Sequence, residues 1–170
     1  MPTGIDDIIA KANSYLDQVK TKAYCHFLMS ENAGRKNVIL GIFVTLFSSV
    51  VGTAIFTAIS KGSTVFWIQV TTGFMSIAAA VLAAFQTFFH FNEISQKHKI
   101  AATDYDKVLH MLDIFLLSFL PASDQRDKAL AELKSIVEEL QKVEESSPSV
   151  PDSVYNRVMR KKMSSTGRNK

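Results

Sequence analysis

"GFMSIAAAVLAAFQTFFH", residues 73–90, carries no charged side chain, yet small and polar residues are spread all along it. The uncharged stretch around it extends from residue 62 to residue 92. About 20 apolar residues in an α-helix, at about 1.5 Å per residue, span the hydrocarbon core of a bilayer. The stretch is long enough and therefore predicts a transmembrane helix.

A second uncharged stretch, residues 37–60, precedes the first, and only Lys61 separates the two. A soluble core helix of this length normally has a charged polar face, and neither stretch has one. We therefore predict an all-α membrane protein with two transmembrane helices. They are joined by a tight hairpin at "SKGST", residues 60–64, where Gly62 can adopt a left-handed turn. The alternative is a wholly buried hairpin in a soluble protein.

The distribution of basic residues predicts the orientation of the hairpin. The start of the chain, "MPTGIDDIIA", is acidic where a signal peptide would be basic, so the spans themselves are expected to direct insertion. Lys61 is the one basic residue of the hairpin turn. By the positive-inside rule, a multi-pass membrane protein with both termini in the cytosol is predicted. The basic residues flanking the spans are Lys20, Lys22, Arg35, Lys36, Lys97, Lys99 and Lys107.

Helical periodicity continues on both sides of the spans, and Gly34 is expected to break or kink the chain before the first span. No Gly or Pro lies between Gly73 and Pro121, so one unbroken helix is predicted from Thr64 to Leu120. Its seam is Ile94, His98, Ala101, Tyr105, Val108, Leu112, Phe115 and Phe119, and the next seam is Leu130, Leu133, Val137 and Leu140. The predicted segments are an amphipathic cytosolic N-terminal helix (1–36), the first span (37–60), the hairpin turn and second span (61–92), a cytosolic helical stalk and coiled-coil-like helix (93–145), and a linker with a basic tail (146–170).

On a helical wheel, the small and polar residues of the second span form one stripe and the bulky apolar residues form the opposite face. This stripe has two interpretations, close packing of helices or the lining of a water-filled pathway. Gln69, Gln86 and His90 favour the pathway, because packing does not require long amides. Glu93 is predicted at the cytosolic mouth of such a pore. The predicted pore-lining residues are Gln69, Thr72, Ser76, Ala80, Ala83, Thr87 and His90.

The first span has a weaker stripe of the same kind, which we interpret as helix packing. Two helices cannot enclose a pore, so a pore requires several copies of the chain. The predicted partners are therefore the lipid bilayer and further copies of this chain, with a tetramer as the working stoichiometry. The predicted packing residues are Gly41, Thr45, Ser48, Gly52 and Gly73.

Other functions find little support in the sequence. It contains no phosphate-binding glycine loop and no catalytic dyad in a supporting context, so no enzyme, cofactor or nucleic-acid partner is predicted. His90 and Glu93 share a helix face but are better explained by a hydrogen bond at the membrane interface than by a metal site. His98 is interpreted as a satisfied core histidine rather than a ligand. A single cysteine, Cys25, excludes an internal disulfide framework.

The pattern resembles the SLATT domain, a two-span module of bacterial conflict systems, over about residues 9–120. The residues that carry the resemblance are an amphipathic lead-in with His26, "NVILGIFVTLFSSVVGTAIF" (37–56), the short hairpin, and "NEISQKHKIAATDYDKVL" (92–109). In the last of these, His98 and Tyr105 occupy polar positions typical of the family. The resemblance implies a pore-forming effector that permeabilises a membrane when a sensor or nucleotide-signal system fires, here an unlinked sensor protein.

The sequence thus predicts an oligomeric membrane pore or ion channel. The alternative is a membrane-anchored structural or adaptor protein that presents a cytosolic helical oligomerisation region. No potassium-filter signature and no acidic ring occur within the spans, so high ion selectivity has no visible source.

Overall fold

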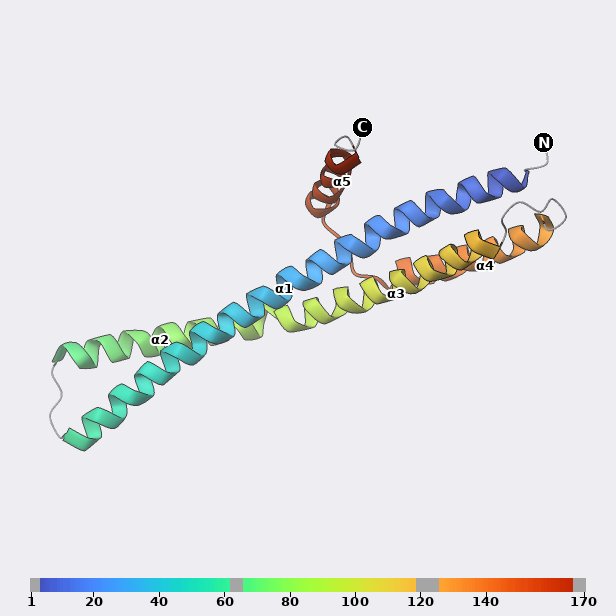
Figure 1. The fold of residues 1–170 in the computed structure, drawn as a ribbon. Coiled ribbons are helices and arrows are strands. Elements are labelled where there is room, and N and C mark those ends of the chain that lie inside the picture. Colours follow the sequence, from blue (N-terminus) through green and yellow to red (C-terminus); the bar gives the residue numbers. More distant parts are fainter. Residues whose placement is uncertain (1–3, 62–65, 119–125, 167–170) are drawn as a thin grey trace. The chain divides into compact units, whose positions relative to one another are not determined.

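A computed structural model describes residues 4–61, 66–118 and 126–166. In these ranges the chain is helical and contains no strand, which confirms the all-α prediction (Figure 1). The predicted turn residues 62–64 lie outside the described part. The helices are α1 (Ile5–Lys61), α2 (Phe66–Phe89), α3 (Phe91–Ser118), α4 (Arg126–Ser146) and α5 (Asp152–Thr166).

The chain divides into two compact units. The bundle unit comprises residues 1–30 and 96–170, and it contains the first part of α1, most of α3, and all of α4 and α5. The hairpin unit comprises residues 31–95, and it contains the rest of α1, all of α2 and the first turn of α3.

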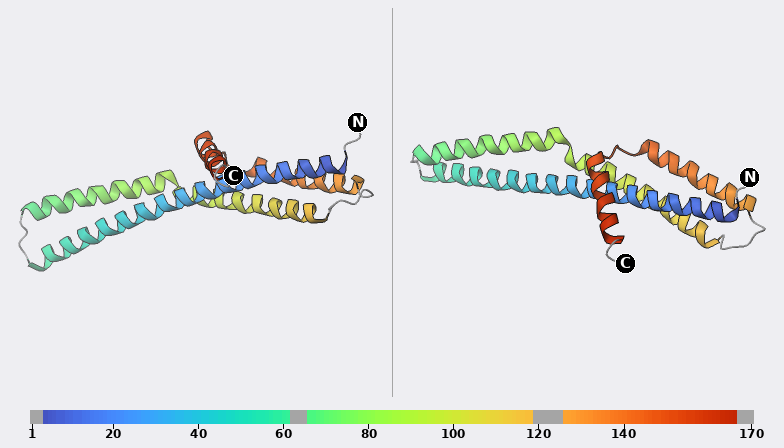
Figure 2. Two further views of the ribbon diagram at one scale, coloured as in Figure 1. Left: turned by 45° about the horizontal axis from the view of Figure 1, so that its top comes forward. Right: turned by 90° about the horizontal axis from the view of Figure 1, so that it is seen from above.

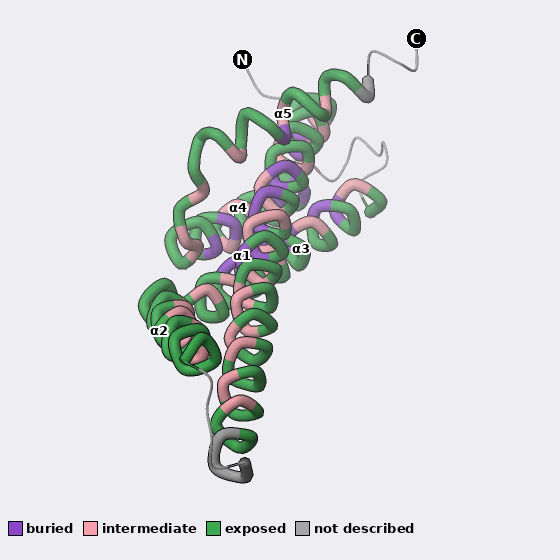
Figure 3. The backbone as a smooth tube through the Cα atoms, turned by 90° about the vertical axis from the view of Figure 1, so that its left-hand side faces the viewer, coloured by how far each residue is buried: buried purple, intermediate pink, exposed green. Residues whose placement is uncertain are grey.

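The bundle unit has a core of apolar side chains from α1, α3 and α4. Figure 3 marks the buried residues of these helices in purple. The residues of α3 that face this core recur at alternating steps of three and four, the spacing of a coiled-coil seam. Leu112 and Phe115 of this core are fully buried. Ile94, predicted in the seam, is exposed, and Phe119 lies outside the described residues. The buried residues of α3 are His98, Ala101, Tyr105, Val108, Leu112 and Phe115.

Helix α4 uses a different seam from the predicted one. Leu130 is 47% exposed and Val137 is only half-buried, whereas Leu133 and Leu140 are buried as expected. The small side chain of Ala129 is fully buried, so this side of α4 can approach its neighbours closely and Leu130 is turned outward. The observed seam is Ala129, Leu133, Ile136, Leu140 and Val143.

The basic C-terminal helix α5 runs across α1 rather than along it (Figure 2). Val158 is its buried contact residue. The Lys162 ammonium forms an ion pair with Asp17 of α1 at 2.5 Å, and the Lys161 ammonium lies 6.0 Å from the centre of the Tyr24 ring. An apolar contact of Val158 and cationic contacts of Lys161 and Lys162 thus attach α5 to the N-terminal part of α1.

In the hairpin unit, α1 continues through Gly34 without a break, so the predicted break is wrong. A Cβ atom added at Gly34 would lie 3.2 Å from the Ser95 Oγ. Gly34 therefore provides a close approach between two segments of the hairpin unit, and the backbone remains helical because glycine tolerates helical angles.

The helix predicted to run unbroken through the second span is interrupted at His90, which separates α2 from α3. His90 has a φ of 47°, in the left-handed region, where histidine is more common than most residues with a Cβ. Helical hydrogen bonding resumes at once, because the Ile94 amide donates to the His90 carbonyl at 3.0 Å. The prediction is therefore wrong at one residue, and it failed because neither Gly nor Pro marks the site.

Candidate functional site

The two helices of the hairpin unit pack through half-buried residues. The Gln86 side-chain amide donates to the Asn37 Oδ1 across the hairpin at 3.3 Å, and it lies beside Gly41. Gln86 therefore has a packing role, so it no longer supports a wet surface. The half-buried residues are Asn37, Leu40, Gly41, Val44, Phe47, Val51 and Ala54 of α1, with Thr72, Met75, Ala78, Ala79, Leu82, Ala83 and Gln86 of α2.

The predicted pore-lining residues divide between two surfaces. Thr72 and Ala83 are half-buried on the side of α2 that packs on α1. The other members are exposed in the single chain, and the Thr87 hydroxyl donates to the Ala83 carbonyl of its own helix at 3.0 Å. The exposed members are Gln69, Ser76, Ala80, Thr87 and His90, and Glu93 is exposed in the first turn of α3.

The predicted packing residues also divide. Gly41 lies at the contact with α2, and its carbonyl accepts a hydrogen bond from the Thr45 hydroxyl at 2.9 Å. Gly52 and Gly73 have open space beside their α-carbons in the single chain, and Ser48 is exposed. A packing role for Gly52, Gly73 and Ser48 therefore requires another molecule, and it remains a prediction.

The small residues of the two spans come to the same side of the hairpin. On each helix, the small residues lie about a quarter of a turn around the helix axis from the side that packs on the other helix, at 3.6 residues per turn. The sense of this rotation is the same on both helices when each is followed from its N-terminus. Because the two right-handed helices run in opposite directions, these equal rotations bring both stripes to one side. We call this side the small-residue face; it comprises Gly41, Thr45, Ser48, Gly52, Gln69, Gly73, Ser76, Ala80 and Thr87.

Large apolar side chains cover the remaining outer surface of α2, where Phe74, Phe88 and Trp67 are more than two-thirds exposed. Helix α2 buries no residue at all. The apolar segments of both spans are long enough to cross a membrane, and none of their most apolar parts is buried. In water such a surface would be strongly unfavourable, whereas lipid is a matching solvent for it.

In the bundle unit, α1 and α3 bring two buried histidines into direct contact. The Nδ1 atoms of His26 and His98 are 3.0 Å apart, and the two residues are 3% and 4% exposed. The Tyr105 ring stacks on His26 with 5.3 Å between ring centres. The prediction of His98 as a satisfied core histidine is confirmed. Its partner could not be predicted, since His26 lies 72 residues away and no local spacing links the two.

Burial and charge govern the protonation of this cluster. Burial, then the neighbouring His98 and Lys22, lowers the pKa of His26 from 6.5 to about 4. Burial also lowers the pKa of His98 and raises the pKa values of Cys25 and Tyr105. The cluster is therefore neutral at physiological pH. Beside the cluster, the Lys22 ammonium forms an ion pair with the Glu144 carboxylate of α4 at 2.5 Å.

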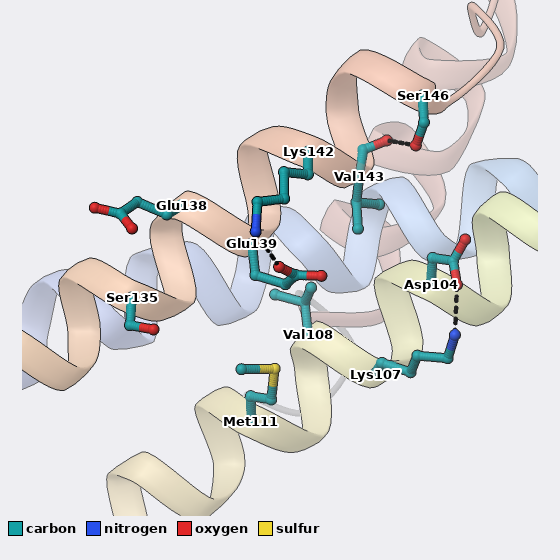
Figure 4. Close-up of a pocket in the computed structure, with 10 residues that line it drawn as sticks. All are labelled: Asp104, Lys107, Val108, Met111, Ser135, Glu138, Glu139, Lys142, Val143 and Ser146. Atoms are coloured by element: carbon teal, nitrogen blue, oxygen red, sulfur yellow. Dashed lines mark hydrogen bonds and ion pairs between the residues drawn. The ribbon is translucent and has the colours of Figure 1, made fainter.

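A second feature of the bundle unit is a groove of about 530 Å³ between α3 and α4 (Figure 4). Four of its charged lining side chains form ion pairs, Asp104 with Lys107 at 2.7 Å and Glu139 with Lys142 at 3.0 Å, and Glu138 is the remaining charged lining residue. Because these opposite charges cancel locally, the groove does not present a concentrated charge to a ligand.

Metal binding finds no support in the described ranges, where no group of three or more His, Cys, Asp or Glu residues is arranged to hold an ion. The His90 Nδ1 instead makes a hydrogen bond to the Phe88 carbonyl at 2.8 Å. This contact agrees with the hydrogen-bond interpretation of His90.

Two long apolar helices with uncovered surfaces, joined to a helical bundle, define a two-span membrane protein. Comparison with protein families gives the particular class. Residues 18–160 match the SMODS and SLOG-associating 2TM effector domain family 4. The chain therefore belongs to this SLATT family and is a membrane-associated effector of conflict systems. No curated protein and no solved structure matches it.

Proposed function

We propose that this effector assembles as a homo-oligomer whose hairpins surround a membrane pore. The small-residue face carries the proposal, because it gathers Gly, Ala, Ser, Thr and Gln residues from both spans on one side of the hairpin, and all of them except Gly41 are exposed. Polar groups facing hydrocarbon are unfavourable, whereas a neighbouring chain or a water-filled pathway accommodates them. Two spans cannot enclose a pathway alone, so several copies must contribute this face.

Small side chains support assembly in a second way. Gly52 and Gly73 leave open space beside the helix backbones, and such space allows the helices of another copy to approach closely. Gly52 and Gly73 would then pack between copies. Ser76, Ala80 and Thr87 would face the pathway, whose conduction would depend on width and wetting.

The proposal also includes an orientation in the membrane and a trigger. The basic residues on both flanks of the hairpin support a cytosolic location for the termini and the bundle unit, with Glu93 near the cytosolic mouth of the pore. The family name describes the domain as associating with SMODS and SLOG, and this supports a separate sensor protein as the trigger. No enzymatic step is proposed for the chain.

Conductance of the purified chain in a planar bilayer tests the proposal. Ala80→Phe adds a large ring on the small-residue face, and Val81→Phe adds a ring one residue further on, among the exposed bulky side chains. Both positions are exposed, so neither change disturbs the hairpin contact. We expect Ala80→Phe to reduce single-channel current at least several-fold while the oligomer survives on size exclusion, and Val81→Phe to conduct as the wild type.

Two outcomes would contradict the proposal. If Val81→Phe blocks while Ala80→Phe conducts normally, the pathway follows the bulky side. If the wild-type oligomer is well folded and never conducts, the small-residue face is a packing surface, and the chain is a membrane-anchored adaptor.

A further inference from the structure

The contact between His26 and His98 constrains the protons that the pair can hold. A neutral imidazole has one N–H, so an Nδ1 to Nδ1 hydrogen bond requires one ring to donate and the other to present a bare nitrogen. We propose that this pair is a proton-sensitive latch, which holds α1 against α3 in the bundle unit while it is neutral and releases them on acidification. The inference is independent of the pore, because it is read out from the packing of the bundle unit.

Each added proton has a defined consequence. The first can bind the Nε2 of the donor ring, which preserves the Nδ1 contact but places an imidazolium cation in the core. The second must bind the bare Nδ1 of the acceptor ring. Two N–H groups and two positive charges then face each other at 3.0 Å, so the hydrogen bond is lost and the rings repel.

The cavity beside His26 gives protons access to the ring. The groups that line it do little to stabilise a positive charge there. His26 lines a cavity of about 320 Å³ that also reaches the segment after α4. Among the described residues, Glu144 is the one carboxylate that lines this cavity, and it is paired with Lys22, whose own positive charge disfavours an imidazolium. The titratable groups that line the cavity with His26 are Lys22 and Cys25 from α1, Tyr105 from α3, Glu144 from α4 and Tyr155 from α5.

A proton fits the pair better than a metal ion does. The two nitrogens are at direct hydrogen-bonding distance, and the described residues supply no third ligand for a metal. The chain has four histidines, and the other two, His90 and His110, are exposed. His110 lies on α3 in the same unit, so it provides a matched control for histidine titration.

Hydrogen exchange of the full chain in lipid nanodiscs tests the latch. Peptides from residues 5–30 and 96–118 would be followed at pH 7.5 and pH 5.0, with rates corrected for intrinsic exchange. For a pKa lowered from 6.5 to about 4, we expect the opening equilibrium of the wild type to rise roughly 30-fold at the lower pH. His110→Gln should show the same rise.

The double variant His26→Gln, His98→Gln retains a donor and an acceptor but cannot titrate. Its opening equilibrium should change by less than about threefold between the two pH values. An undiminished rise in the double variant, or none in the wild type, would overturn the proposal. Loss of protection at pH 7.5 on treatment with EDTA would also overturn it, in favour of a metal site.

A direct titration keeps the proposal testable if the double variant does not fold. Histidine side-chain NMR signals of the wild-type chain in nanodiscs, assigned by comparison with His90→Gln and His110→Gln, give each protonation midpoint. We expect the His26 midpoint well below pH 6. A midpoint near 6.5 would show that the pair takes up protons without constraint and would refute the latch.

Discussion

The bundle unit and the hairpin unit are both helical, but the first buries its large apolar side chains and the second leaves them exposed. In the bundle unit, Phe115 and Leu112 of α3 are completely buried. In the hairpin unit, α2 buries no residue, and Phe74 and Phe88 are mostly exposed. The hydrophobic effect drives apolar groups away from water, so the two units must fold in different solvents. The described helices of the bundle unit cover one another's apolar side chains, whereas lipid must cover those of the hairpin unit.

The aromatic residues allow the two units to be followed separately. All four tyrosines, Tyr15, Tyr24, Tyr105 and Tyr155, belong to the bundle unit, and the one tryptophan, Trp67, belongs to the hairpin unit. Near-ultraviolet signals of tyrosine thus report on the bundle unit, and Trp67 fluorescence reports on the hairpin unit. The predictions that follow use this separation.

The largest difference should appear on truncation of a phenylalanine in each unit. Phe115→Ala removes a fully buried ring and should lower the free energy of unfolding of the bundle unit by about 4 kcal/mol. Phe85→Ala removes a ring that is half exposed and should cost less than about 1 kcal/mol. Urea unfolding in detergent, followed by tyrosine signals for the first and Trp67 for the second, measures both. Equal costs would show that α2 has a buried core within one chain.

Acidification should weaken only the bundle unit. The folded state holds the pKa of His26 at about 4, so between pH 6.5 and 4 the unfolded chain binds more protons than the folded one. The stability contribution of neutral His26 is therefore complete above pH 6.5 and is lost as the pH falls towards 4, by up to about 3 kcal/mol. Urea midpoints from tyrosine signals should follow this curve. A parallel loss reported by Trp67 would contradict the separation of the units.

A smaller effect distinguishes the predicted from the observed seam of α4. Leu133→Ala should cost about 2–3 kcal/mol because Leu133 is buried, whereas Leu130→Ala should cost less than about 1 kcal/mol. The two leucines lie on one helix, so propensity and context are matched. Urea unfolding followed by tyrosine signals compares them, and equal costs would restore the seam predicted from the sequence.

The features that the sequence predicts correctly depend on residues that are close together along the chain. The two spans are predicted from the composition of neighbouring residues, and most of the α3 seam is predicted from helical periodicity. The same periodicity correctly predicts that His98 is a core residue. The contact of His98 with His26 joins positions 72 residues apart, and no local pattern encodes it. A helical wheel of α2 alone predicts a wet surface at Gln86, because it does not include the other helix. The hydrogen bond from Gln86 to Asn37 shows that Gln86 packs across the hairpin.

The smallest effect concerns His90, where the sequence predicted a continuous helix and the structure has a left-handed residue. A β-branched residue is strongly disfavoured at positive φ, whereas glycine adopts it freely. We expect His90→Val to destabilise the hairpin unit by about 1–2 kcal/mol and His90→Gly to change it by less than about 0.5 kcal/mol, although the contact of the ring with the Phe88 carbonyl is lost. Urea midpoints from Trp67 fluorescence compare the two variants.

Spin labels at Ser76 and Asn92 measure the distance between these two positions in the same two variants. A straight helix places their backbones about 24 Å apart, at 1.5 Å per residue, and the break shortens this distance. If His90→Val is tolerated without loss and the label distance lengthens to that of a straight helix, the second span can continue unbroken into α3. The break at His90 would then be one of two accessible conformations. If the distance is instead unchanged and stability is lost, the break is a fixed feature of the hairpin unit.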